Sequence, residues 1–314
     1  MNKFNPEDLK KLYIPSPSSH KGQNGKLAII GGSHLFHGAS LWALKVASRI
    51  VDMVFYSSVK ENNEIAQRLK NKLYDLIVIP RERVDDYLKE ADAILIGPGL
   101  PREEGRTGVE ESTRGLVERL LKKFSHKKWV IDGGALTEID PEWLKQLNGN
   151  VILTPHQGEF ERLFHNVILE RSSAMQNEAI ESSIKQEILS RSLLPQEDLL
   201  LRSGALQDDV VKMAKEYNST ILLKGLKDVI CSLNECVAIE GGNAGMTKGG
   251  TGDVLAGLVA ALACKNDLFL AAKAGSFINK KAGEELFKKV GYYFNASDLA
   301  NEIPRVMKYY ISES

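Results

Sequence analysis

The sequence lacks the features of a membrane, secreted or nucleic-acid-binding protein. It contains no apolar run of about 18 residues, the length needed to cross a bilayer. Its first residues, MNKFNPEDLKKLYIPSPSSHKG, include no apolar stretch of the kind a signal peptide requires. Lys+Arg and Asp+Glu are equal at 41 each, so no basic field is available to gather nucleic acid. We therefore expect a soluble, cytoplasmic protein without membrane or nucleic-acid partners.

Cysteine is also scarce. The three cysteines are Cys231, Cys236 and Cys264, and no pair has CxxC spacing. A sparse, odd count predicts neither a disulfide framework nor a zinc site, and it suits a reducing compartment. The histidines near the first glycine turn lack an acidic cluster at ligand spacing, so we expect no metal site built from protein ligands.

Short apolar runs alternate with helical patterns along the chain. The runs are rich in Ile and Val and bounded by Gly, Pro or Asp, which is typical of buried strands; they cover residues 26–30, 53–57, 76–79, 93–96, 129–131, 151–153 and 220–223. Amphipathic stretches at 38–50 and 108–124 predict helices, residues 228–232 and 236–239 a hairpin, and residues from 251 onward a helical end. This alternation predicts an α/β fold with a mostly parallel sheet covered on both faces.

Residues 166–203 interrupt this rhythm. The segment is polar, rich in Ser, Gln and Glu, and helical in composition, without a strand pattern. We interpret it as a solvated helical insertion in a single domain spanning residues 1–314. The alternatives are a subunit contact or a lid over the site.

Glycine-containing turns follow five of the predicted strands. They read GGS at 31–33, GPGL at 97–100, DGG at 132–134, TPH at 154–156 and KG at 224–225. Ligands of open α/β sheets bind outside the carboxyl ends of the strands. Five such turns on one edge therefore predict a cleft that a ligand approaches closely.

The most informative segment is NAGMTKGGTGDVLAG at residues 243–257, just before an apolar helix at 254–263. First-turn amides without helical partners, together with the helix dipole, form an anion site, and glycine lets the backbone approach phosphate oxygens. We expect the dipole to favour ionised Asp253, which can take a proton from a hydroxyl that attacks phosphorus. The alternative is an ordinary first-turn acid.

Two further residues are candidates for the same cleft. His156 follows a predicted strand in TPHQGEF, so its imidazole is expected to face the cleft, although a lone histidine is often structural. Lys248 could add positive charge near a phosphate or could be a surface lysine. The chain contains neither the GxxxxGK[ST] pattern of a P-loop nor a GxGxxG dinucleotide fingerprint.

Seven segments together resemble the NAD(P)H-hydrate dehydratases of the ribokinase-like superfamily. In chain order they are HKGQNGKLAIIGGS, HGAS, IGPGL, TPHQGEF, LLKG, GNAGMTKGGTGDVLAG and ASDLANEIP, and the resemblance covers nearly the whole chain outside the insertion. It implies a ribokinase-like three-layer α/β/α sandwich. It also implies a hydro-lyase that repairs NAD(P)H hydrated on its reduced ring (NAD(P)HX), by phosphorylating the ring hydroxyl with ADP or ATP and Mg²⁺ and then eliminating phosphate.

The resemblance also implies roles for individual residues. Asp253 would be the base, and the amides around Gly250 and Gly252 would hold the transferring phosphoryl group. Residues at the hydrate site would be Ala39, Gly99, His156 and Asp253. Residues beside the adenine nucleotide would be Lys224, Gly225, Leu226, Lys227, Asp228 and Gly252.

The chain departs from the family pattern in five places: Gly134, Gln157, Leu226, Asp228 and Lys248. Gly134 stands where relatives often have an acid, and Asp228 where they have threonine. The family further implies a homo-oligomer, expected to be a tetramer, and a separate NAD(P)HX epimerase, since no epimerase domain precedes this one. Two other functions remain open: a superfamily kinase for a vitamin precursor or sugar alcohol, and a nucleotide-binding protein without catalysis.

Overall fold

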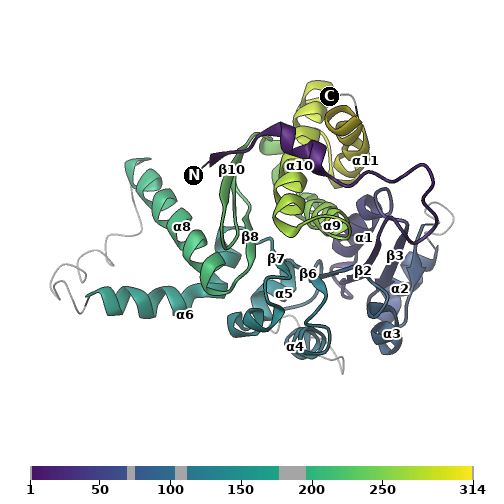
Figure 1. Ribbon diagram of the computed structural model, residues 1–314, viewed down its shortest axis with the longest axis horizontal. Coiled ribbons are helices and arrows are strands. Elements are labelled where there is room, and N and C mark those ends of the chain that lie inside the picture. The colour runs from purple at the N-terminus through teal and green to yellow at the C-terminus, as the bar shows by residue number, and fades with distance from the viewer. Residues whose placement is uncertain (1, 69–74, 103–111, 177–195, 313–314) are drawn as a thin grey trace.

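A mixed ten-stranded sheet forms the centre of the described part of the chain, with strand order β1-β10-β9-β8-β7-β6-β5-β2-β3-β4. The computed structural model describes residues 2–68, 75–102, 112–176 and 196–312 (Figure 1). The strands are β1 (Asn2–Lys3), β2 (Lys26–Ile30), β3 (Met53–Ser57), β4 (Ile77–Val78), β5 (Ala93–Ile96), β6 (Lys128–Ile131), β7 (Val151–Leu153), β8 (Thr220–Leu223), β9 (Lys227–Cys231) and β10 (Cys236–Glu240).

The strands from β8 across to β4 run parallel to one another. Only β9 runs antiparallel to its neighbours, β8 and β10, and β1 then pairs parallel with β10. The seven predicted strands and the hairpin are confirmed, with differences of one or two residues at their ends. All the parallel strands therefore end at the same edge, as the glycine turns predicted.

Helices cover both faces of the sheet, which confirms the three-layer α/β/α sandwich. On one face lie α1 (His37–Ala47), α9 (Thr251–Ala263), α10 (Leu268–Val290) and α11 (Ala296–Met307). On the other lie α3 (Val84–Leu88), α4 (Thr113–Lys123), α5 (Gly133–Glu138), α6 (Gln157–Gln176) and α8 (Gln196–Glu216), while α2 (Lys60–Arg68) follows β3. Along β5, Leu95 packs into the first layer whereas Ile94 and Ile96 pack into the second, which is why the strand is apolar throughout.

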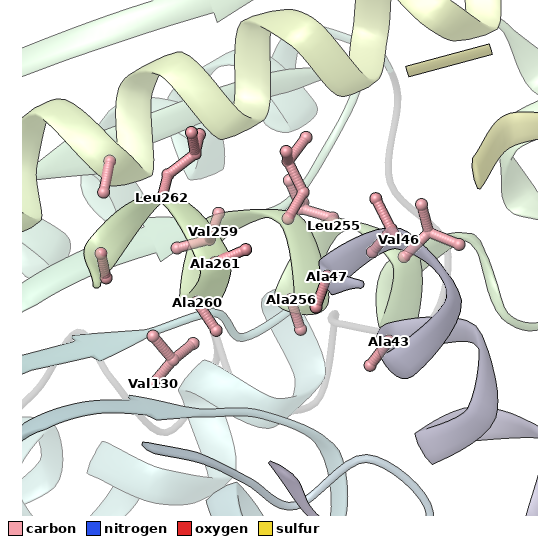
Figure 2. Packing of buried hydrophobic residues seen from close by; sticks show 14 of the residues in the cluster. Ala43, Val46, Ala47, Val130, Leu255, Ala256, Val259, Ala260, Ala261 and Leu262 are labelled. Carbon is pink, nitrogen blue, oxygen red and sulfur yellow. The ribbon is translucent and has the colours of Figure 1, made fainter. Parts of the chain in front are cut away.

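Helix α9 is buried along almost its whole length, and many of its side chains are small. Figure 2 shows Ala260 of α9 close to Val130 of β6, and Ala47 of α1 next to Ala256 of α9. A Cβ at Gly257 would lie only 2.6 Å from the Ala43 carbonyl oxygen, so the absence of a side chain lets α1 and α9 touch through their backbones. This close packing holds the N-terminus of α9 against the edge of the sheet.

The polar segment at 166–203 is described only at its two ends. Helix α6 continues to Gln176, α8 begins at Gln196, and Figure 1 shows both extending away from the rest of the chain. The middle of the proposed insertion, residues 177–195, lies outside the described residues, as does the start of the helix predicted at 108–124.

The cysteines differ from expectation. Cys231 and Cys236 form a disulfide, and Cys264 is a free, buried cysteine. The cysteine count suggested no disulfide because it ignored the hairpin, which places residues 231 and 236 directly opposite each other with their Cα atoms 4.2 Å apart. No helix in the described ranges is long and apolar enough to span a membrane.

Candidate active site

The turns that follow the parallel strands pack closely against one another. Gly97 adopts φ +121°, and a Cβ there would lie 1.7 Å from the Asp132 carbonyl oxygen. Gly99 adopts φ +74°, and its Cβ would lie 2.3 Å from the Phe36 carbonyl oxygen and 3.1 Å from the Ala39 side chain. Both positions therefore require glycine. The structure brings Ala39 and Gly99, two of the predicted site residues, into contact.

The turn before α9 has the geometry of an anion cradle. Gly250 is the N-cap of α9, with φ +93° and no side-chain cap. Within the described residues, the Gly252 amide has no backbone carbonyl as partner. Thr251 Oγ1 donates to the carbonyls of Met246 (2.5 Å) and Lys248 (2.9 Å), which fixes the turn. An unpaired amide at a helix N-terminus suits an anion such as phosphate.

Trp42 of α1 lies against this turn. A Cβ at Gly250 would lie 2.4 Å from the Trp42 indole, and one at Gly38 would lie 3.2 Å from the far edge of the same ring. Trp42 therefore contacts both the turn before α9 and the first turn of α1, where Ala39 lies.

Lys248 does not reach into the turn. Its ammonium donates to the carbonyl of Phe294 (2.7 Å) and to that of Tyr292, in the segment between α10 and α11. The structure therefore favours a role in packing over a phosphate contact for this lysine.

Asp253 lies in the first turn of α9 beside a group of charges from three other elements. Lys224, at the end of β8, pairs with Asp132 at 2.9 Å and lies 3.9 Å from Glu159. Burial and the carboxylates of Asp132 and Glu159 raise the pKa of Asp253 to about 7, although Lys224 lowers it. The expectation that the helix dipole would favour ionised Asp253 is thus wrong, because burial and repulsion outweigh the dipole.

Lys224 is the cation at the centre of this group. Burial opposes its charge, but Asp132 and Glu159 raise the pKa of Lys224 above its usual value. Thr154 Oγ1 also donates to Asp132 Oδ1 at 2.7 Å, the same oxygen that Lys224 contacts. Lys224 also lies near the N-terminus of α9, since a Cβ at Gly252 would lie 3.6 Å from Lys224 Nζ.

His156 joins this group through Glu159. Its Nδ1 accepts from the Glu159 amide at 3.2 Å, its Nε2 lies 3.4 Å from Glu159 Oε1, and its own amide donates to Glu159 Oε2 at 2.9 Å. Both ring nitrogens therefore face Glu159, while 56% of the side chain is exposed.

The loop after Lys224 is exposed at its tip and anchored at its base. Leu226 is 96% exposed, and Lys227 pairs with Glu240 at 3.6 Å. Asp228 is buried, and its carboxylate accepts from the Gly225 amide (2.9 Å) and from Ser276 Oγ (2.7 Å). The Asp228 side chain thus points into the protein and is not available to a nucleotide. Only the backbone of Asp228 forms part of the edge of the loop.

Sequence reasoning did not assign Asp132, Glu159 or Trp42 to the site. Asp132 and Glu159 were visible at strand ends, in DGG and TPHQGEF, but they were treated as part of the turns. Gly134 is explained by packing, since a Cβ there would lie 2.1 Å from the Leu100 carbonyl oxygen.

A cavity of about 620 Å³ lies elsewhere, beside α2 and the segment after β4. It shares Gly32 and Leu100 with the glycine turns, but neither Asp253 nor Lys224 lines it. The charges and the anion turn, rather than this cavity, form the candidate active site.

Comparison with known proteins assigns the family. The model of the family described as NAD(P)H-hydrate dehydratase matches residues 27–192 and 195–305. The chain belongs to this family. An ADP-dependent (S)-NAD(P)H-hydrate dehydratase of Nitrosopumilus maritimus is 35% identical over 315 residues, covering 96% of this chain and 95% of the relative.

A bifunctional NAD(P)H-hydrate repair enzyme of Methanocaldococcus jannaschii is 34% identical over 306 residues. The match covers 96% of this chain but 52% of that relative, so the chain spans about half the length of this bifunctional relative.

Solved structures confirm the ribokinase-like fold. A ribokinase-like superfamily protein of Enterococcus faecalis has a TM-score of 0.73 at 23% identity, covering 99% of this chain and 96% of its own. The ADP/ATP-dependent NAD(P)H-hydrate dehydratase of Bacillus subtilis, co-crystallised with ATP and Mg²⁺, has a TM-score of 0.70 at 22% identity and covers 98% of both chains.

Proposed function

We propose that this protein dehydrates NAD(P)HX to NAD(P)H, using an adenine nucleotide to phosphorylate the ring hydroxyl before phosphate is eliminated. The observation that carries the proposal is Asp253, with a pKa raised to about 7, in the first turn of α9 beside the Gly250 anion turn. A base works best when its pKa lies near the working pH. Family membership supplies the substrate.

Asp253 takes the proton of the ring hydroxyl as the hydroxyl oxygen attacks the terminal phosphorus of the nucleotide, and the bridging P–O bond breaks so that AMP leaves when ADP is the donor. The amides at Gly250 and Gly252 hold the oxygens of the transferring group, where negative charge accumulates. Lys224 offsets the charges of Asp132 and Glu159, which would otherwise repel the phosphates. The bond between the ring carbon and the phosphate oxygen then breaks with its electrons leaving on phosphate. The neighbouring ring carbon loses a proton to water, and its C–H electrons form the double bond that restores the reduced nicotinamide.

The other predicted residues form two groups, one for each substrate. Ala39, Gly99 and His156 line the nicotinamide hydrate, and the backbone of residues 224–228 lies along the nucleotide. The exposed Leu226 side chain offers an apolar surface to the adenine ring. We infer ADP as the donor because a relative matched over nearly its full length is named ADP-dependent.

Mg²⁺ fits this site as a partner of the nucleotide. Among the described residues, no group of three or more His, Cys, Asp or Glu side chains could hold a metal ion, and Asp132 and Glu159 are already engaged by Lys224. A bound Mg²⁺ would neutralise charge on the phosphates and would rely mainly on phosphate oxygens and water as ligands. A homotetramer, a separate epimerase and a cytoplasmic location belong to the same proposal.

The decisive experiment mixes the protein with hydrated NADH, Mg²⁺ and either ADP or ATP, and follows the absorbance of the restored dihydronicotinamide. We expect a rise with ADP. No rise with either nucleotide would overturn the proposal, and accumulation of a stable phosphorylated product would instead indicate a kinase.

A further inference from the structure

Lys280 is a buried lysine outside the reaction centre. It lies on α10, is 6% exposed, and within the described structure its ammonium faces four oxygens. Three are backbone carbonyls, of Gly225 (3.0 Å), Leu226 (3.2 Å) and Gly241 (3.4 Å). The fourth is Asp228 Oδ1, at 3.2 Å. An ammonium has three protons to donate, so this cage satisfies it without water.

The cage joins two separate loops. Residues 225 and 226 connect β8 to β9, whereas Gly241 follows β10. Neighbouring turns of α10 hold the same loops: Ser276 donates to Asp228 Oδ2 at 2.7 Å, and Glu284 Oε1 accepts from the Gly242 amide at 3.1 Å. The polar stripe of Ser276, Lys280 and Glu284 therefore clamps both loops to α10.

Packing cannot provide this restraint. Gly225, Leu226 and Lys227 are exposed, and Leu226 leaves 96% of its surface in solvent. These three residues have no buried side chain that could fix their position by packing, so hydrogen bonds to the backbone hold this part of the loop. Burying an ammonium and a carboxylate also carries a desolvation cost, so such a pair is a poor source of stability. The carbonyl contacts identify what Lys280 does: it sets the position of the loop.

We propose that Lys280 is a positioning residue that holds the loop at residues 225–228 in its nucleotide-binding position before the nucleotide arrives. This inference rests on the proposed function, in which that loop lies along the adenine nucleotide. A loop already ordered in the free protein avoids part of the entropic cost of binding. Asp228, whose side chain points away from the nucleotide, then acts through Lys280 and the Gly225 amide.

The test uses the double variant Asp228→Asn/Lys280→Met, because Lys280→Met alone leaves a buried carboxylate without its partner. Asparagine keeps one oxygen for the Gly225 amide, and its NH2 group can donate to Ser276 Oγ where the aspartate oxygen accepted from it. The matched control is Lys288→Met, on the same helix, whose lysine pairs with Glu285 at the surface. Three quantities are measured: hydrogen exchange at residues 225–228 and 241–243 without nucleotide, the Kd for ADP by calorimetry, and kcat at saturating ADP.

We expect faster exchange in both loops and a Kd for ADP raised about tenfold, which corresponds to about 1.4 kcal/mol. We expect kcat at saturating ADP to stay within about twofold, since a weakened loop lowers binding before it alters the reaction centre. The control should match the wild type throughout. Unchanged exchange, or faster exchange with unchanged ADP affinity, would overturn the inference. A wild-type protein that binds no adenine nucleotide would instead overturn the proposed function, while the exchange data would still test the clamp.

Discussion

Two lysine–aspartate pairs lie near the loop at residues 225 and 226, and their surroundings differ. Lys224 pairs with Asp132 but also faces Glu159 and Asp253, so this group carries more negative than positive charge. Lys280 pairs with Asp228 and otherwise contacts backbone carbonyls. The first group therefore raises the pKa of a nearby acid, whereas the second is balanced in charge.

The difference shows how one kind of ion pair serves two purposes. Excess carboxylates around Lys224 make protonation of Asp253 easier, which suits proton transfer. Carbonyl acceptors around Lys280 cannot titrate, which suits a fixed loop. Variants at the first pair should change the pH dependence of the reaction, and variants at the second should not.

The largest effect is expected from Asp253→Asn. Asparagine keeps the shape of the side chain but cannot accept the hydroxyl proton, so turnover should fall about 10³-fold or more, while ADP still binds. Steady-state rates and calorimetry measure the two quantities. Asp298→Asn, at a similar place in the first turn of α11, serves as the control and should keep its activity. Normal turnover in Asp253→Asn would remove this residue from the mechanism.

The same variant should alter the pH dependence of stability. The folded-state pKa of Asp253 is about 7, above its ordinary value of 3.8, so the folded protein favours the protonated form. The stabilisation that the folded protein gains from protonated Asp253 is fully present below pH 3.8. It is lost as the pH rises through 7. Asp253→Asn should therefore match the wild type near pH 4 and be more stable at pH 8 by up to about 4 kcal/mol. Denaturant titrations at both pH values test this, and an equal difference at both would contradict the raised pKa.

The variant Lys224→Met tests whether the two lysine–aspartate pairs differ in their effect on the pH dependence of the reaction. Lys224 lowers the pKa of Asp253, so its loss should raise that pKa further and leave less base ionised at pH 7. We expect kcat/KM at pH 7 to fall roughly 10- to 100-fold and to recover in part at higher pH. The Asp228→Asn/Lys280→Met variant should keep the wild-type pH profile. If both variants shifted the profile equally, the distinction between the pairs would fail.

The smallest effect at the site is expected from reducing the Cys231–Cys236 disulfide. The bridge closes a short loop at the end of the β9–β10 hairpin away from Lys227 and Glu240, so its reduction should cost about 2 kcal/mol of stability. The Kd for ADP should not change if Lys280 holds the loop. Thermal unfolding and calorimetry with and without reductant measure both. A weaker Kd after reduction would show that the hairpin also positions the loop.

Local pattern was sufficient for much of the fold. Residues 26–30, 93–96 and 151–153 were predicted as strands and are strands, because short apolar runs of β-branched residues have few alternatives in a sheet covered on both faces. The glycine turns predicted which edge would carry the site, since parallel strands all end on one side.

The charges around the site could not be predicted in the same way. Lys224 meets Asp132 across 92 residues of sequence, and Lys280 meets the loop at residues 225 and 226 across 55 and 54. No periodicity encodes such contacts. The helix dipole, a local property, gave the wrong direction for the pKa of Asp253 because the dominant effects, burial and distant carboxylates, come from the tertiary structure.

By itself, the sequence determined the parallel α/β architecture, the glycine turn at Gly250 and the family, because each strand, turn and motif is a short run of neighbouring residues that can be read in chain order. Only the tertiary structure decided that Asp253 is a weak acid, that Asp228 points inward and that Lys280 joins two loops. Burial and Coulomb interactions depend on distance in space, and the folded chain alone sets those distances.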